Sequence, residues 1–220
     1  MEITMTITIR EPGSAITHYI AMMMALLAST PLLIKAVLSG QKSVFAAMFI
    51  FICSMILLYG ASAMYHSVNV SGKILRWFRK FDHMMIFILI AGTYTPVCLI
   101  TLKGTLGYTL FAVIWGIALF GILIKLCWIT CPKWFSSMIY IAMGWTCVGV
   151  MKPLWITLPT AAFMWLLIGG IIYTLGGVIY ALKLPVFNAR FKYFGSHELF
   201  HLFVMAGSIC HFVFMFFYVI

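Results

Sequence analysis

The sequence predicts an all-α fold, a polytopic bundle of seven transmembrane helices whose N-terminus is cytoplasmic. Three observations lead to this prediction. Of the 220 residues, 65% are hydrophobic and only 8% are charged, and the mean hydropathy is +1.13, which is typical of a chain whose solvent is lipid. Long apolar runs follow one another with short connections between them. The basic residues fall unequally on the two sets of connections, which indicates an orientation in the membrane.

Each apolar run is interpreted as one span, because a helix of about 20 largely apolar residues crosses a hydrocarbon core of roughly 30 Å. The first run follows the polar N-terminal segment, and the second follows Lys42. The third comes after a basic segment that ends at Lys80, the fourth after Lys103 and the fifth after Lys133. The sixth begins beside Pro159 and the seventh after a mixed polar stretch. In order, the predicted spans are Ala15–Leu38, Val44–His66, Asp82–Leu102, Leu106–Leu126, Phe135–Met151, Leu158–Leu182 and His197–Val219.

Together these spans are expected to form a single domain over residues 1–220, with no extramembrane module and no removable signal peptide at the N-terminus. Prolines at the edge of or inside the runs predict kinks and not loops, because neighbouring helices and Ser/Thr side chains can satisfy the freed carbonyls. Glycines in the sixth span are expected to let helices approach closely. The prolines are Pro31, Pro96 and Pro159, and the glycines are Gly169, Gly170, Gly176 and Gly177.

The 14 Lys and Arg residues predict the orientation, because cytoplasmic loops retain positive charge during insertion. Ten fall on the side of the N-terminus and four on the other side, so the N-terminus is expected in the cytoplasm and the C-terminus outside. The net charge of +10 is interpreted as this topology signal together with attraction to anionic lipids, and not as nucleic-acid binding. The ten are Arg10, Lys73, Arg76, Arg79, Lys80, Lys125, Lys133, Lys183, Arg190 and Lys192; the four are Lys35, Lys42, Lys103 and Lys152.

Ionisable residues at membrane depth are costly and usually mark function. His66 closes the second predicted span, Asp82 opens the third, and His197 and His201 open the seventh, so all four are expected at the cytoplasmic end. His197 and His201 are four residues apart, which places them on one helical face about 6 Å apart along the axis. Ser62 lies one turn before His66 on the same face.

Three imidazoles with an open fourth position are typical of a catalytic zinc site, in which the metal lowers the pKa of bound water to about 7. The sequence therefore predicts Zn²⁺ on His66, His197 and His201. Asp82 would orient or activate the bound water, and Ser62 would hydrogen-bond Asp82, the water or a substrate carbonyl. The alternative is that these groups cap helix ends or hydrogen-bond between helices at the wet interface. Imidazole ligands also suit several other divalent metals.

Four sequence motifs resemble those of the progestin and adipoQ receptor family, in particular its bacterial branch of haemolysin III-like membrane proteins. They are Ser62-Ala-Met-Tyr-His66-Ser, Phe81-Asp82-His83, Ala91-Gly-Thr-Tyr-Thr-Pro96 and His197-Glu-Leu-Phe-His201-Leu-Phe-Val-Met-Ala-Gly207. The resemblance runs nearly end to end. It implies seven spans, a cytoplasmic N-terminus, zinc on the histidines matching His66, His197 and His201, an aspartate acting on the zinc-bound water at Asp82, and a serine at Ser62. One departure is Tyr19, where the bacterial branch usually has glycine.

Three further ionisable residues outside this set each have a separate expectation. His197-Glu-Leu-Phe-His201 also fits the H-E-x-x-H pattern of zinc metalloproteases, in which the glutamate is the general base. Glu198 is therefore a possible second base, although the sequence lacks the acidic segment that usually supplies the third ligand in membrane-embedded proteases. His18, at the start of the first span, is expected to form a hydrogen bond at the interface, with a place in the same vestibule as the alternative. His83 is expected to point away from Asp82.

The leading functional hypothesis is a zinc-dependent hydrolase of a lipid amide or ester, the substrate class being implied by the ceramidase-like relatives of the family. A second hypothesis is a membrane sensor or regulator, responding to lipid composition or membrane energetics, with structural zinc. A haemolysin or cytolysin is third and an intramembrane metalloprotease fourth. Membrane lipids are the expected partners, a bacterial plasma membrane is the expected location, and the sequence indicates no particular oligomeric state.

Overall fold

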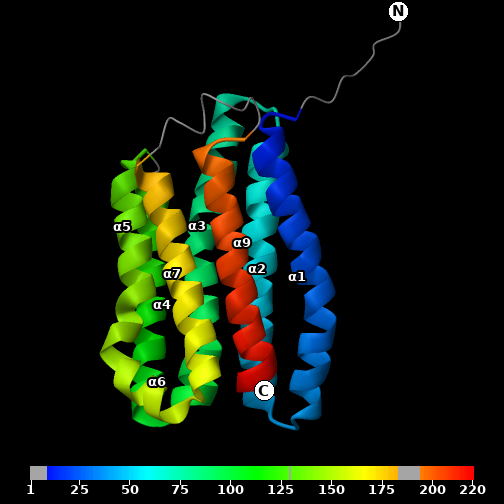
Figure 1. Cartoon of the computed structure of the whole chain (residues 1–220). Coiled ribbons are helices and arrows are strands. Elements are labelled where there is room, and N and C mark those ends of the chain that lie inside the picture. The colour runs from blue at the N-terminus through cyan, green and yellow to red at the C-terminus, as the bar shows by residue number, and fades with distance from the viewer. Residues whose placement is uncertain (1–8, 129, 183–193) are drawn as a thin grey trace, which may run out of the picture.

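A computed structural model of the chain describes residues 9–128, 130–182 and 194–220. These residues contain no strand, and seven of their helices are long and apolar enough to cross a membrane. The helices run side by side in one bundle (Figure 1). The all-α, seven-span, multi-pass membrane fold that the sequence predicts is thus confirmed.

Within the described residues, the spans are built from eight α-helices and three segments of tighter or wider winding. Several spans are single helices, whereas the third, fifth and seventh change winding along their length. In chain order they are α1 (Pro12–Leu38), α2 (Lys42–Ser67), α3 (Gly72–Pro96) with the π-helical segment Val97–Leu102, α4 (Gly104–Cys127), α5 (Lys133–Gly144) with the 3₁₀ segment Trp145–Val150 and α6 (Met151–Thr157), α7 (Thr160–Leu182), and α9 (Ser196–Phe214) with the π-helical segment Met215–Val219.

The third helix begins ten residues before the predicted start at Asp82. Its first turns carry Lys73, Arg76, Arg79 and Lys80, so the search for apolar runs excluded them. They are helical all the same, because an α-helix does not require apolar residues. Long basic side chains can keep their charges in the polar interface while their stems cover apolar surface. The consequence for the site is that Asp82 lies about three turns inside α3, and it is buried there.

The fifth span extends six residues past its predicted end at Met151 and is interrupted by the 3₁₀ segment. The break frees backbone groups, and the Tyr94 hydroxyl from α3 contacts two of them. It donates to the Gly144 carbonyl at 2.5 Å and accepts the Cys147 amide at 3.0 Å. Such groups need internal partners because the hydrocarbon core offers no water.

The three prolines behave differently from one another. Pro31 lies inside α1, as expected. Pro96 ends the regular winding of α3, and the helix continues in π-helical turns, because proline has no N–H for the ladder. The prediction of a kink is wrong for Pro159, which lies in the connection between α6 and α7. Leu158 before it is extended (φ −95°, ψ 142°), which is the conformation that a following proline favours.

A seam of small residues brings α1 against α2. Ala21, Ala25 and Ala36 are buried on one face of α1 together with Leu32. Alanine side chains let two helices approach closely, which is how helices associate where lipid removes the hydrophobic driving force. The same face continues upward to His18, so the packing that joins α1 to α2 also directs this part of α1 towards the histidines.

Glycines serve the same purpose between α7 and α9. A Cβ on Gly176 would lie 2.7 Å from the Cβ of Phe203, and one on Gly207 would lie 2.6 Å from the Tyr173 ring. Gly169 faces His211 of α9 in the same way, whereas Gly177 faces Ile141 of α5; close approach at both is as the sequence predicts. The prediction is wrong for Gly170, which has nothing within 4 Å of its Cβ position.

The start of α1, the end of α2 and the start of α9 lie at one end of the bundle, shown at the top of Figure 1. All four basic residues predicted for the other side lie towards the opposite helix ends. Of the ten predicted for the N-terminal side, Lys183, Arg190 and Lys192 lie outside the described residues. The side of the membrane that each end faces stays a prediction.

Candidate metal site

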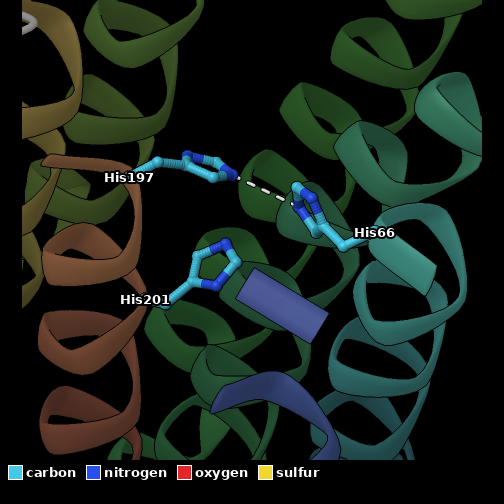
Figure 2. A group of neighbouring side chains, drawn as sticks. All are labelled: His66, His197 and His201. Atoms are coloured by element: carbon cyan, nitrogen blue, oxygen red, sulfur yellow. Dashed lines mark hydrogen bonds between the residues drawn. The ribbon is translucent and has the colours of Figure 1, made fainter. Parts of the chain in front are cut away.

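Three histidines that are distant in sequence meet at this end of the bundle. His66 lies in the last turn of α2, and His197 and His201 lie in the first two turns of α9. Figure 2 shows the α9 pair reaching across to His66. One ring nitrogen from each residue lies within 4.8 Å of the other two, so the three could hold a metal ion.

The ring geometry fits such an ion. The Nε2 atoms of His66 and His197 are 3.2 Å apart. Two nitrogens bound tetrahedrally at 2.0–2.1 Å from one zinc ion would be separated by about 3.4 Å. His66 and His201 are almost completely buried. Three neutral imidazoles also form a donor set that zinc accepts while keeping a fourth position open.

The nitrogens on the far side of two rings have partners from the start of α1. His66 Nδ1 is hydrogen-bonded to the carboxylate of Glu11, the residue before α1. This hydrogen bond, with the nearby positive charge of Arg10, holds the pKa of Glu11 below its usual value. His201 Nδ1 lies 3.1 Å from the Thr17 hydroxyl.

Sequence reasoning missed Glu11 because it started the first span at Ala15, and it missed Thr17 because its partner, His201, lies on another helix. A usable signal was present, since Glu11 is one of only four acidic residues in the chain. An acid next to a membrane span is costly unless it has a partner, and that alone marks it for attention.

Asp82 and Ser62 lie beside the histidines, as the sequence predicts. Both are buried and both line the same cavity as His197 and His201. The Ser62 hydroxyl lies beside the Asp82 carboxyl group. The prediction for His83 is wrong, because its Nδ1 lies 3.5 Å from an Asp82 oxygen. Both side chains line the cavity.

Glu198 is committed elsewhere. One carboxylate oxygen accepts a hydrogen bond from the Ser14 hydroxyl, and the other accepts the Gly195 backbone N–H at 2.8 Å. The side chain thus satisfies a donor at the N-terminus of α9, where such donors otherwise lack partners, and ties α9 to α1. This geometry supports neither the second base nor the metalloprotease interpretation.

His18 is not an interfacial hydrogen-bonding residue. Its side chain is buried, and within the described residues neither ring nitrogen has a hydrogen-bond partner. The ring stacks on His201 with centroids 3.5 Å apart and planes 13° apart. α1 begins earlier than expected, so His18 lies in its second turn and not at its start. His18 therefore lines the cavity beside the other histidines, which is the alternative that the sequence left open.

A largely apolar cavity extends from the histidines into the bundle. Its lining includes Asp82 and Tyr94 on α3, which are 12 residues apart, so the cavity follows this helix for about 18 Å. At its far end it reaches Leu154 and Phe163. The cavity therefore joins a polar cluster that could hold a metal ion to a long apolar space.

Comparison with known proteins places the chain in a family. The model of the family described as "Haemolysin-III related" matches residues 7–212. This chain belongs to the haemolysin III family. It is 39% identical to Hemolysin-3 of Bacillus cereus over 96% of this chain and 92% of that protein, and 37% identical to the Hemolysin-3 homolog of Bacillus subtilis (strain 168) over 96% and 95%.

The haemolysin III chain is also related at a greater distance to an adiponectin receptor. It is 25% identical to the Adiponectin receptor protein of Drosophila melanogaster, over 78% of this chain and 41% of that protein. The match to the haemolysin III family model includes every residue of the candidate metal site. The resemblance that the motifs indicate, to the bacterial branch of the receptor family, is confirmed.

Proposed function

We propose that this haemolysin III family protein is a zinc-dependent hydrolase of a lipid amide or ester in a bacterial plasma membrane. The observation that carries the proposal is the placement of a three-histidine cluster beside a long apolar cavity, which two of the three, His197 and His201, line. Such a cavity suits an acyl chain, and it would direct the carbonyl of that chain towards the histidines. Membrane lipids would then serve as substrates that enter from the bilayer.

His66, His197 and His201 would hold the ion. When bound, zinc supplies Lewis-acid activation of a carbonyl and lowers the pKa of water to about 7. Asp82 would accept the proton of the attacking water and later return it to the leaving group, which is the work of a general acid–base residue. Ser62, which lies beside Asp82, would orient that carboxylate by donating a hydrogen bond to it.

The test uses the purified protein with stoichiometric zinc, assayed against ceramides, acyl amides and phospholipids alongside active family members. Replacing Asp82 by Asn should lower the rate by about 10²–10⁴-fold while zinc content stays at the wild-type level. Glu198→Gln is the matched control and should retain activity, because the Glu198 carboxylate is bound to Ser14 and Gly195. No turnover on any of these lipids by the wild type would refute the proposal.

A second candidate is a membrane sensor or regulator in which zinc is structural. One observation favours it: the three histidines join α2 to α9, which are far apart in sequence, so an ion there would cross-link the bundle. In this case replacing Asp82 by Ala should mainly lower stability, because a structural metal contributes to folding. A hydrolase should instead lose activity and keep its zinc and its melting temperature.

Cytolysis is a third candidate, and it rests on the name of the Bacillus cereus relative. The seven apolar spans count against it as a primary role, since a secreted toxin needs a soluble state. Lysis of red cells by detergent-free purified protein would support it.

A further inference from the structure

We propose that the start of α1 positions the metal ligands: Glu11 and Thr17 hold His66 and His201 as Nδ1–H tautomers, so that the Nε2 atom of each ring faces the ion. The inference rests on the proposed metal binding and assigns a task to residues that do not touch the metal. Its basis is the pair of hydrogen bonds to the far side of these rings.

The Glu11 contact sets the tautomer of His66. A carboxylate can only accept a hydrogen bond, so Nδ1 must be the protonated nitrogen of a neutral ring. Nε2 then carries the lone pair, and this is the atom that lies 3.2 Å from His197. The backbone fixes the contact further, because the Glu11 N–H donates to the His66 carbonyl at 3.0 Å. Glu11 is therefore held in register with the residue that it positions.

The Thr17 contact sets the tautomer of His201 by a different route. A hydroxyl has one hydrogen, and Thr17 Oγ1 lies 3.0 Å from the Gly13 carbonyl and 2.9 Å from the Ser14 carbonyl. Carbonyls only accept, so they take that hydrogen, and the oxygen is left to accept from His201 Nδ1–H. The ring plane is fixed by the stacked His18. The remaining nitrogen, Nε2, then carries the lone pair, and Figure 2 shows this side of the His201 ring turned towards His66 and His197.

The two contacts come from one helix, although the ligands come from two others. A ligand histidine usually donates its other N–H to such a partner, which fixes the ring and raises its basicity, and loss of the partner typically lowers metal affinity 10–100-fold. The metal affinity of the site would therefore depend on how the start of α1 packs against α2 and α9.

The experiment measures the zinc dissociation constant of the full chain in detergent by competition with a chromophoric chelator. Glu11→Ala and Thr17→Val should each raise it about 10–100-fold. Glu11→Gln and Thr17→Ser keep an acceptor oxygen and should recover most of the affinity. The Glu11 side chain makes no capping hydrogen bond to α1, so its removal does not uncap that helix.

Thr93→Val is the matched control, because Thr93 is buried and its hydroxyl bonds to Leu89 of its own helix. Its dissociation constant should equal that of the wild type. Unchanged affinity in Glu11→Ala and Thr17→Val would overturn the inference while leaving the metal site intact. Absence of zinc binding by the wild type would overturn the proposed function as well, so the two failures can be told apart.

A second measurement is made on the wild-type protein. In zinc-free protein with ¹⁵N-labelled histidine, nitrogen shifts and long-range couplings distinguish the two tautomers, and single histidine substitutions assign the signals. His66 and His201 should both carry the proton on Nδ1. An Nε2–H tautomer at either residue would refute the inference.

Discussion

The acidic residues of this chain gather around its histidines. Three of the four acids lie in the described part of the chain: Glu11 contacts His66, Asp82 contacts His83, and Glu198 contacts Ser14 next to the same cluster. Placing an acid at membrane depth costs free energy unless it has a partner, so the position of each acid indicates where compensating groups lie. At the scale of single residues, the polar chemistry of the protein is therefore concentrated at one end of α1, α2, α3 and α9.

The histidine cluster yields a direct prediction about metal content. Wild-type protein purified without chelator should carry about one zinc ion per chain, and the double variant His197→Ala, His201→Ala should carry none, because one remaining imidazole cannot hold the ion. His211→Gln is the control, since it lies ten residues, or about 15 Å, past His201 on the same helix. Metal analysis after dialysis checks this, and equal metal in wild type and double variant would contradict it.

Sequence and structure agree best on residues that a helical repeat relates. Ser62 and His66, and His197 and His201, are each four apart, so their shared faces follow from the helix period. His18 and Glu198 could not be placed in this way, because their partners come from other helices. The stacking of His18 on His201 and the contact between Glu198 and Ser14 depend on how α1 packs against α9.

At the scale of helices, the apolar runs predict that seven spans exist but not where each helix starts. The runs mark the part of a helix inside lipid, whereas α3 begins in a basic segment that lipid does not cover. The fifth span shows the opposite case: its apolar run is continuous, yet it changes winding at Gly144, where Tyr94 offers partners to the freed backbone. Such tertiary contacts leave no signal in a hydropathy pattern.

The close packing of α7 and α9 gives a prediction for glycine substitutions. Gly207→Ala would place a methyl group 2.6 Å from the Tyr173 ring, which cannot yield easily, because its hydroxyl bonds to Ser208 at 2.8 Å and its ring stacks on His211. Overpacking costs about 1–3 kcal/mol. Alanine gains at most about 1 kcal/mol of helix propensity over glycine. The net effect should therefore be destabilising.

Gly170→Ala is the matched control in the same helix pair, because nothing lies within 4 Å of its Cβ position. It should leave stability unchanged or raise it by up to about 1 kcal/mol. Denaturation of both variants in mixed detergent micelles, followed by circular dichroism, measures the difference. Equal midpoints for the two variants would show that the α7–α9 interface tolerates the added methyl group.

For the whole molecule, the distribution of charge and the position of the site together predict on which side of the membrane the site lies. The histidine cluster lies at the helix ends that carry Arg10, Arg76, Arg79 and Lys80, and the opposite ends carry far fewer basic residues. If positive charge selects the cytoplasm, the metal site opens on the cytoplasmic side, and the apolar cavity extends from there towards the outer leaflet.

This orientation can be tested with reporters on the full chain. Green fluorescent protein fused to the N-terminus, before Met1, should fluoresce. The same reporter fused to the C-terminus, after Ile220, should stay dark, because green fluorescent protein folds poorly outside the cytoplasm. Alkaline phosphatase after Ile220 should be active, since it needs an oxidising compartment for its disulfides. An odd number of spans requires the two termini to report opposite sides. A dark N-terminal fusion together with an inactive C-terminal phosphatase would show that the bundle has the opposite orientation. The histidines would then lie on the outer side, and any lipid carbonyl would have to reach them from the outer leaflet.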